Sequence, residues 1–459
     1  MDETNQGNTA VPAFGNAYMW AVTNHRISFS SPYLFTHGNP YGHDSMTPTE
    51  IMLRAMLVLT WGPRPSMAHA PPYMLDAVYD ALDEIKKREA FLTHIRPEKH
   101  IGLVMSDNTN CFYSRSAGAD EERYLSNVLG MFRMGMEEHL GFTVINDWNL
   151  NDEDLSEYKV LLLPNTACLD KRQIEAVRNF VRNGGGLVAS VDASLFDEMG
   201  NPREGFALSD VFGVDYRGIP TGEGGKTEQL DVNFLRGVNA DYWNKRKNIF
   251  DLRLAEWDTV WRDERLKTYL ADQPVVFKGQ AVSVQPVSPE AKVLATISPR
   301  VAGAETLPAV VANTYGKGRA VFFAAGMDSA YYLYPYPYQR ILLKDALEWV
   351  TPAPFGIEVE APMSVHATFR RQAKDGGRLI VHLYNGTNST ANHAKPAEDI
   401  PVREEIIPIH DIKVTFKGYD IKKLRLEPEG MELPLTLEGG KIEVVVPKLK
   451  IHTMVVADL

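Results

Sequence analysis

The chain has 459 residues, of which 44% are hydrophobic and 23% charged, with a formal net charge of −11. This length suits two or three domains with substantial cores, and the acidic balance without any run of Lys or Arg argues against nucleic acid or an anionic membrane as a partner. Two cysteines, Cys111 and Cys168, exclude a disulfide framework, and no apolar run approaches the ~20 residues that span a bilayer, so we expect a cytoplasmic protein.

The first 98 residues contain too few elements to enclose a core of their own. The apolar run at 17–22 predicts a strand. A helix is expected at 47–59, where Thr47 and Pro48 provide a helix start, and a second helix at 73–92. One strand and two helices cannot bury their apolar faces alone, so this segment must pack against another part of the chain.

A loop between these elements gathers polar and aromatic side chains. Its candidates for substrate binding are His37, Asn39, Tyr41, His43, Asp44 and Trp61. Such mixtures are typical of concave sugar sites, and a subunit or domain interface uses the same residue types. Two histidines beside Asp44 could also ligate a metal, but their spacing matches no standard motif. We therefore predict no metal and no cofactor, and we keep the sugar site and the interface as alternatives.

Residues 99–351 alternate strands with helices, as doubly wound α/β domains do. The clearest unit begins with an apolar run at 158–163, which predicts a strand buried on both faces. Asp170 and Gln173 have the form of a capping box that begins a helix, and the glycines at 184–186 end this helix before a second strand. Further strands are expected at 100–105, 142–145 and 292–297, a hairpin at 308–324, and helices at 121–139 and 338–350.

The carboxyl end of the second strand, residues 190–194, is where an open α/β sheet normally holds a ligand or a nucleophile. A nucleophile elbow needs Ser or Cys flanked by glycines, and the sequence ASVDAS at 189–194 has no cysteine and no glycine. Cys168 lies one strand earlier without an evident partner, so we expect an ordinary half-buried thiol. Asp192 is expected to cap a helix rather than to catalyse a reaction.

After a linker at 351–354 the pattern changes to short alternating runs without a helical period. These runs lie at 357–360, 365–370, 379–384, 411–416, 421–426, 441–446 and 452–456, and they predict an antiparallel β-sandwich. The predicted domains are therefore 1–98, 99–351 and 352–459.

Two motifs carry a family resemblance, NFVRNGGGLVAS at 179–190 and YGKGRAVFF at 315–323. Both resemble the β-galactosidase trimerisation domain of family-42 glycoside hydrolases and of related hypothetical glycosyl hydrolases. The resemblance implies a flavodoxin-like, class I glutamine-amidotransferase-like fold over 99–351 that has lost its catalytic cysteine, a β domain after it, and homo-oligomerisation. The first 98 residues then resemble the tail of a catalytic (β/α)₈ barrel, most of which the chain lacks.

The resemblance supplies no catalytic residue. The family's nucleophile is a Glu near the end of barrel strand seven, whereas residues 18–23 contain no carboxylate, and the acid/base Glu lies earlier in the family barrel. Retaining glycoside hydrolysis needs two carboxyl groups across the scissile bond. Asp44, Glu50, Glu256 and Asp258 are candidates by residue type only.

We favour a glycoside-hydrolase-related, β-galactosidase-like protein that forms a homo-oligomer, with a carbohydrate ligand and neither nucleic acid nor a membrane as a partner. The alternative is a non-catalytic assembly or carbohydrate-binding subunit of the same fold. Amidotransferase or protease chemistry at Cys168 is a third hypothesis. For the favoured hypothesis, the sugar site is expected near the loop that ends at Trp61.

Overall fold

The structure is a computed structural model that describes residues 9–32, 46–67, 72–114, 121–150, 155–220, 249–255, 257, 259–270, 274–299, 305–373, 377–389 and 403–459. The chain divides into two compact units. Unit 1 comprises Met1–Lys99, Gly135–Thr143 and Phe355–Leu459, and unit 2 comprises His100–Met134 and Val144–Pro354. Across the described ranges, every helix is too short or too polar to cross a membrane.

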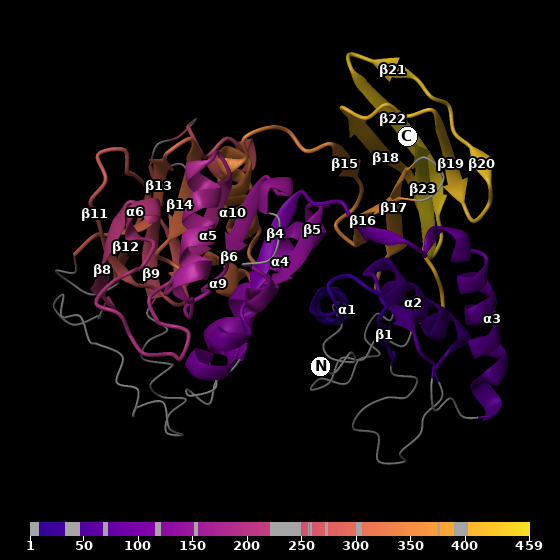
Figure 1. Ribbon diagram of the computed structural model, residues 1–459, viewed down its shortest axis with the longest axis horizontal. Coiled ribbons are helices and arrows are strands. Elements are labelled where there is room, and N and C mark those ends of the chain that lie inside the picture. Colours follow the sequence, from indigo (N-terminus) through magenta and orange to yellow (C-terminus); the bar gives the residue numbers. More distant parts are fainter. Residues whose placement is uncertain are drawn as a thin grey trace. The chain divides into compact units, whose positions relative to one another are not determined.

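Unit 2 is built on a mixed nine-stranded sheet in the order β10-β9-β12-β13-β14-β7-β6-β4-β5 (Figure 1). Its strands are β4 (Ile101–Met105), β5 (Phe142–Asn146), β6 (Val160–Leu163), β7 (Gly186–Ser190), β9 (Ile249–Leu254), β10 (Val275–Lys278), β12 (Lys292–Pro299), β13 (Leu307–Tyr315) and β14 (Gly318–Phe323). The pairs β4 with β6, β6 with β7 and β7 with β14 are parallel, and β13 with β14 is the expected antiparallel hairpin. The predicted flavodoxin-like α/β architecture is confirmed.

Helices cover both faces of this sheet. They are α4 (Ser126–Glu137), α5 (Lys171–Arg182), α6 (Ser209–Phe212), α8 (Glu264–Leu270), α9 (Met327–Leu333) and α10 (Pro337–Val350). Helix α5 begins with the predicted capping box and buries Val177 in the same cluster as Leu187 of β7. Gly186 of β7 lies close against the end of α10, since a Cβ added at this glycine would be 2.5 Å from the carbonyl oxygen of Val350. Because side chains alternate along a strand, α10 covers the face opposite α5.

Unit 1 contains the predicted antiparallel sandwich. One sheet has the order β15-β18-β22-β21 and the other β20-β19-β23-β17-β16-β3. Their bounds are β15 (Ile357–Glu360), β16 (Val365–Gln372), β17 (Arg378–Asn385), β18 (Ile409–Lys417), β19 (Lys423–Glu427), β20 (Met431–Glu432), β21 (Leu437–Glu438), β22 (Lys441–Leu449), β23 (His452–Asp458) and β3 (Ile95–Pro97). Alternate residues of both sheets, such as Val414, Val444 and Leu383, share one buried cluster.

The N-terminal segment packs against this sandwich. It contains α1 (Ala10–Val22), β1 (Phe29–Ser30), α2 (Pro48–Thr60), β2 (Arg64–Pro65) and α3 (Leu75–Lys86). Strand β3 joins the sheet edge antiparallel to β16. The carbonyl oxygen of Thr60 accepts hydrogen bonds from Thr368 Oγ1 at 2.7 Å and from Arg370 Nη2 at 3.0 Å. The segment therefore completes its core with strands from the other end of the chain.

The strand expected at 17–22 is wrong, because these residues lie in α1. The helix begins at Ala10 and buries Phe14 and Trp20. An apolar run of this length is compatible with a buried helix as well as with a strand. The residues that complete this helix, from Ala10 on, precede the run. The comparison of this run with a seventh barrel strand therefore fails as well.

Candidate functional site

The carboxyl end of β7 makes a strained elbow at the centre of the sheet. Val191 has a φ of +52°, a left-handed conformation that is an outlier for a β-branched residue. Its amide donates to the Phe323 carbonyl oxygen at 2.9 Å, and its side chain is buried. A valine therefore occupies the tip of the elbow, where a nucleophile would be expected in such a fold, and it offers no group for covalent chemistry.

Asn165 ties this elbow to the neighbouring strand. It follows β6 and is itself left-handed, with a φ of +44°. Its backbone amide donates to Ser190 Oγ at 2.9 Å, and its Oδ1 accepts from the Asp192 amide at 3.1 Å. Both strand ends are thus held rigidly at the edge where α/β sheets place their ligands.

Asp192 presents its carboxylate at this edge and does not cap a helix, so that expectation is wrong. The Tyr113 hydroxyl donates to Asp192 Oδ2 at 2.5 Å. Asp192 is 3% exposed, and its Oδ1 has no hydrogen-bond partner. Burial is the main cause that raises the pKa of Tyr113, so its hydroxyl stays a donor at neutral pH. One carboxylate oxygen is therefore held by Tyr113, and the other is buried without a hydrogen-bond partner.

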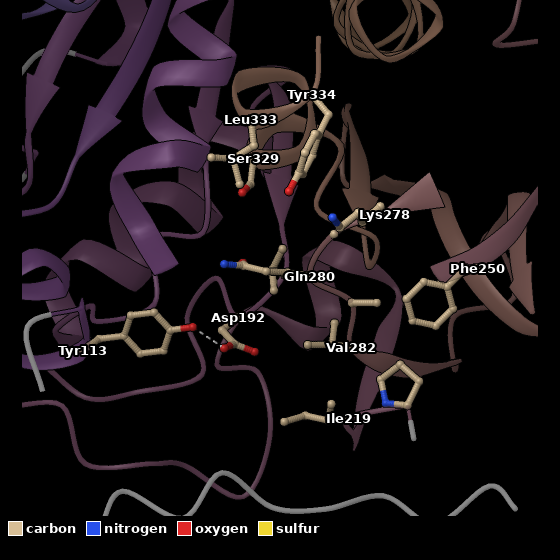
Figure 2. A pocket seen from close by; sticks show the side chains of 14 residues that line it. Tyr113, Asp192, Ile219, Phe250, Lys278, Gln280, Val282, Ser329, Leu333 and Tyr334 are labelled. Atoms are coloured by element: carbon tan, nitrogen blue, oxygen red, sulfur yellow. Dashed lines mark hydrogen bonds between the residues drawn. The ribbon is translucent and has the colours of Figure 1, made fainter. Parts of the chain in front are cut away.

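These two residues line a pocket with about 660 Å³ of atom-free space, its solvent-open mouth included. The enclosed cavity itself measures only about 30 Å³, which is room for one or two water-sized groups. Figure 2 shows Asp192 among the lining side chains, with its second oxygen directed away from Tyr113. Aliphatic side chains, including Ile219, Val282 and Leu333, form much of the wall. The lining therefore offers a ligand both apolar side chains and polar groups.

Lys278 and Tyr334 supply the opposite charge and an aromatic ring. Lys278 ends β10, and its ammonium lies 4.6 Å from the centroid of the Tyr334 ring, close enough for a cation–π interaction. Both residues line the pocket and are half-buried. The wall thus carries one carboxylate and one ammonium, which balance in charge.

A fully buried polar network supports the elbow from below. Asp328 accepts hydrogen bonds from Ser190 Oγ at 2.6 Å, Asn127 Nδ2 at 2.9 Å and the Ser329 amide at 2.9 Å. Burial outweighs these bonds and raises the pKa of Asp328 to about 6. Ser329 also lines the pocket, so the network links the elbow to its wall.

Cys168 is an ordinary thiol, as expected, but it is fully rather than half-buried. The residue is 0% exposed, and this burial raises the pKa of its thiol to about 12. A thiol with this pKa is almost wholly protonated at neutral pH and is a poor nucleophile. Its backbone amide donates to Thr109 Oγ1 at 3.0 Å.

Most of the substrate-binding candidates from the sequence, His37, Asn39, Tyr41, His43 and Asp44, lie outside the described residues, as do Glu256 and Asp258. Trp61 is described and is 4% exposed; its Nε1 donates to His366 Nδ1 at 3.1 Å. Its ring has little free surface for stacking on a sugar in this conformation. Glu50 is fully buried and accepts hydrogen bonds from Arg54 and Arg403.

Sequence patterns located the elbow but missed the pocket around it. Tyr113, Lys278 and Tyr334 come from three separate segments that the fold brings to one sheet edge, and no spacing motif connects them. The described residues contain no group of three or more His, Cys, Asp or Glu side chains that could hold a metal ion.

The family model described as ThuA, trehalose utilisation, matches residues 111–350. No curated protein matches the sequence. This match covers every strand of the nine-stranded sheet except β4, and it includes all residues that line the pocket.

Several solved structures share the fold. The α-L-fucosidase isoenzyme 2 from Paenibacillus thiaminolyticus has a TM-score of 0.66 at 17% identity, with 96% of this chain and 62% of that chain covered. A GH42 β-galactosidase from G. stearothermophilus has a TM-score of 0.63 at 16% identity, with 100% and 58% covered. The β-galactosidase from Rahnella sp. R3 has a TM-score of 0.61 at 16% identity, with the same coverage. The chain spans about 60% of the length of these structures, and the predicted likeness to β-galactosidases is confirmed for the fold.

Proposed function

The chain belongs to the ThuA, trehalose utilisation, family, and from this premise we propose that it is a carbohydrate-active protein that binds a sugar in the pocket beside Asp192. The observation that carries the proposal is the Asp192 carboxylate, with one oxygen held by Tyr113 and the other buried without a partner. A buried acceptor without a partner is costly, and a sugar hydroxyl would satisfy it. The aliphatic wall suits the carbon-bound hydrogens of a sugar ring.

The proposed binding is non-covalent. Val191 stands at the elbow, and Cys168 is protonated and buried, so neither supplies a nucleophile. This supports a binding role for the unit 2 pocket over amidotransferase or protease chemistry.

β-Galactosidase-like hydrolysis is the second candidate function, favoured by the likeness of the fold to β-galactosidases. Asp44, Glu256 and Asp258 stay as proposed carboxylates, and His37, Asn39, Tyr41, His43 and Trp61 stay as proposed sugar contacts. Glu50 is a weaker candidate, because its carboxylate is engaged by two arginines. A cytoplasmic homo-oligomer is part of the same proposal.

Isothermal titration calorimetry with trehalose, D-galactose, D-glucose and L-fucose tests the binding proposal. We expect saturable binding of at least one sugar, which Leu333→Trp should abolish by filling the pocket. Leu435→Trp is the matched control, since Leu435 is 42% exposed in the other unit. Binding that survives Leu333→Trp, or no binding of any of the four sugars, would contradict the proposal. Release of nitrophenol from aryl galactosides and fucosides would instead support hydrolysis.

A further inference from the structure

Resting on the proposed function, we infer that the unit 2 pocket selects uncharged sugars, with one hydroxyl donated to Asp192 Oδ1 and another accepting from the Lys278 ammonium.

The Asp192 carboxylate has one oxygen bonded to Tyr113 and one buried oxygen without a hydrogen-bond partner. Tyr113 occupies Oδ2 at 2.5 Å, and the Asp192 amide is held by Asn165 at 3.1 Å. Asp192 lines the pocket and is only 3% exposed, and its Oδ1 has no hydrogen-bond partner. A carboxylate in such a position gains more from a hydrogen-bond donor than a neutral acceptor would.

Tyr113 is a positioning residue in this arrangement. Its ring packs under the Arg123 guanidinium at 3.7 Å and edge-on against Phe196 at 5.1 Å between ring centroids. These contacts leave the phenol little freedom, so the carboxylate it holds is fixed in direction. Fixed acceptors discriminate between ligands better than mobile ones, because no reorganisation is needed on binding.

Lys278 sets the charge preference together with Asp192. A cationic ligand would satisfy Asp192 but meet the ammonium, and an anionic ligand would meet the carboxylate. Tyr334 has its ring engaged by Lys278, so the apolar face of the sugar is expected against the aliphatic side chains of Ile219, Val282 and Leu333. An uncharged ring with hydroxyls at its edge fits all of these groups at once.

Calorimetry at neutral pH measures the affinities for D-glucose, D-glucosamine and D-glucuronate. The best-binding sugar of the four tested above is measured alongside as the uncharged reference. Wild type should bind the uncharged sugar at least tenfold more tightly than either charged one. Asp192→Asn should weaken the uncharged sugar about five- to tenfold, since a neutral acceptor replaces a charged one, and should improve glucuronate relative to glucosamine. Lys278→Met should shift the preference in the opposite direction.

Asp210→Asn is the matched control, because this carboxylate is half-exposed and pairs with Arg178 away from the pocket. Tyr113→Phe should weaken the uncharged sugar a few-fold while the discrimination against glucuronate persists, which a general loss of structure would not produce. If a sugar binds in a Leu333-dependent manner but Asp192→Asn and Lys278→Met behave like Asp210→Asn, the inference is wrong and the proposed function stands. If no sugar binds and L-serine binds instead, both fail.

Discussion

Glu50 and Arg403 lie 353 residues apart in sequence and form a two-point ion pair inside unit 1. Arg403 Nε donates to Glu50 Oε2 at 2.8 Å, and Arg403 Nη2 donates to Oε1 at 3.0 Å. Arg54 Nε adds a third bond at 2.9 Å. All three side chains are buried, so the carboxylate joins the start of α2 to the strand-rich end of the chain.

Glu50→Gln should lower the free energy of unfolding by about 3–5 kcal/mol, because it removes the buried negative charge that both Arg54 and Arg403 contact. Urea unfolding followed by circular dichroism measures this. Glu358→Gln is the control, since Glu358 pairs with Lys417 at the surface, where such a pair contributes at most about 1 kcal/mol. Equal stability of Glu50→Gln and wild type would mean that the carboxylate is not structural and would reopen its candidacy for catalysis.

Burial of His366 should make the stability of unit 1 depend on pH. Its Nδ1 accepts from Trp61 Nε1 at 3.1 Å, and its Nε2 lies 2.7 Å from Thr9 Oγ1, so the neutral ring carries its proton on Nε2. Burial lowers its pKa to about 3, whereas the unfolded chain titrates near 6.5. The unfolded state binds the proton more tightly, so stability is lost as pH falls below 6.5.

Between pH 7.5 and pH 5 this loss should reach about 2 kcal/mol. His366→Gln should remove that part of the pH dependence in urea unfolding. Trp61→Phe removes the donor but keeps the imidazole buried, so it should lower stability at both pH values and retain the slope. A His366→Gln variant with the wild-type pH dependence would refute this role.

The strands of the sandwich and the strand–helix–strand unit at β6, α5 and β7 were predictable because their signals are local. Alternation along each strand and the Asp170–Gln173 capping box depend only on neighbouring residues. The strand prediction for residues 17–22 failed because the neighbouring residues in the sequence do not determine whether this run forms a strand or a helix. Within this run Trp20 and Ala21 are buried; α1 contacts α2, and the guanidinium of Arg370 lies 4.3 Å from the centroid of the Trp20 ring.

The pocket escaped prediction for a related reason. Only the elbow at 190–194 has a sequence signal, and that signal predicts a nucleophile that Val191 does not provide. Tyr113 and Lys278 are 165 residues apart by their numbers and line one pocket only because the fold brings the segment after β4 and the end of β10 to the same part of unit 2. A conformation such as the left-handed Val191 cannot be read from the residue type, since valine disfavours it.

Cys168 should be inert in the folded protein. Burial raises its thiol pKa to about 12, whereas Cys111 is only half-buried. Labelling with Ellman's reagent at pH 8 should therefore modify Cys111 first and Cys168 only after unfolding in urea. Cys111→Ser should leave no rapidly reacting thiol in the native state. Rapid labelling of Cys168 in that variant, or a lost activity in Cys168→Ser, would support the amidotransferase hypothesis instead.

Asp328 should make unit 2 less stable as the pH rises. Burial raises its pKa from 3.8 to about 6, so the folded state binds the proton more tightly than the unfolded chain, and stability should fall between pH 4 and pH 6 and then level off. A shift of this size corresponds to about 3 kcal/mol. Asp328→Asn cannot ionise, so its stability relative to wild type should improve by up to this amount between pH 4 and pH 7 in urea unfolding. Ser190→Ala removes a donor to the charged form and should steepen the wild-type dependence. If the difference between Asp328→Asn and wild type is the same at both pH values, the carboxyl group is already ionised at pH 4 and the elbow is supported by a charge.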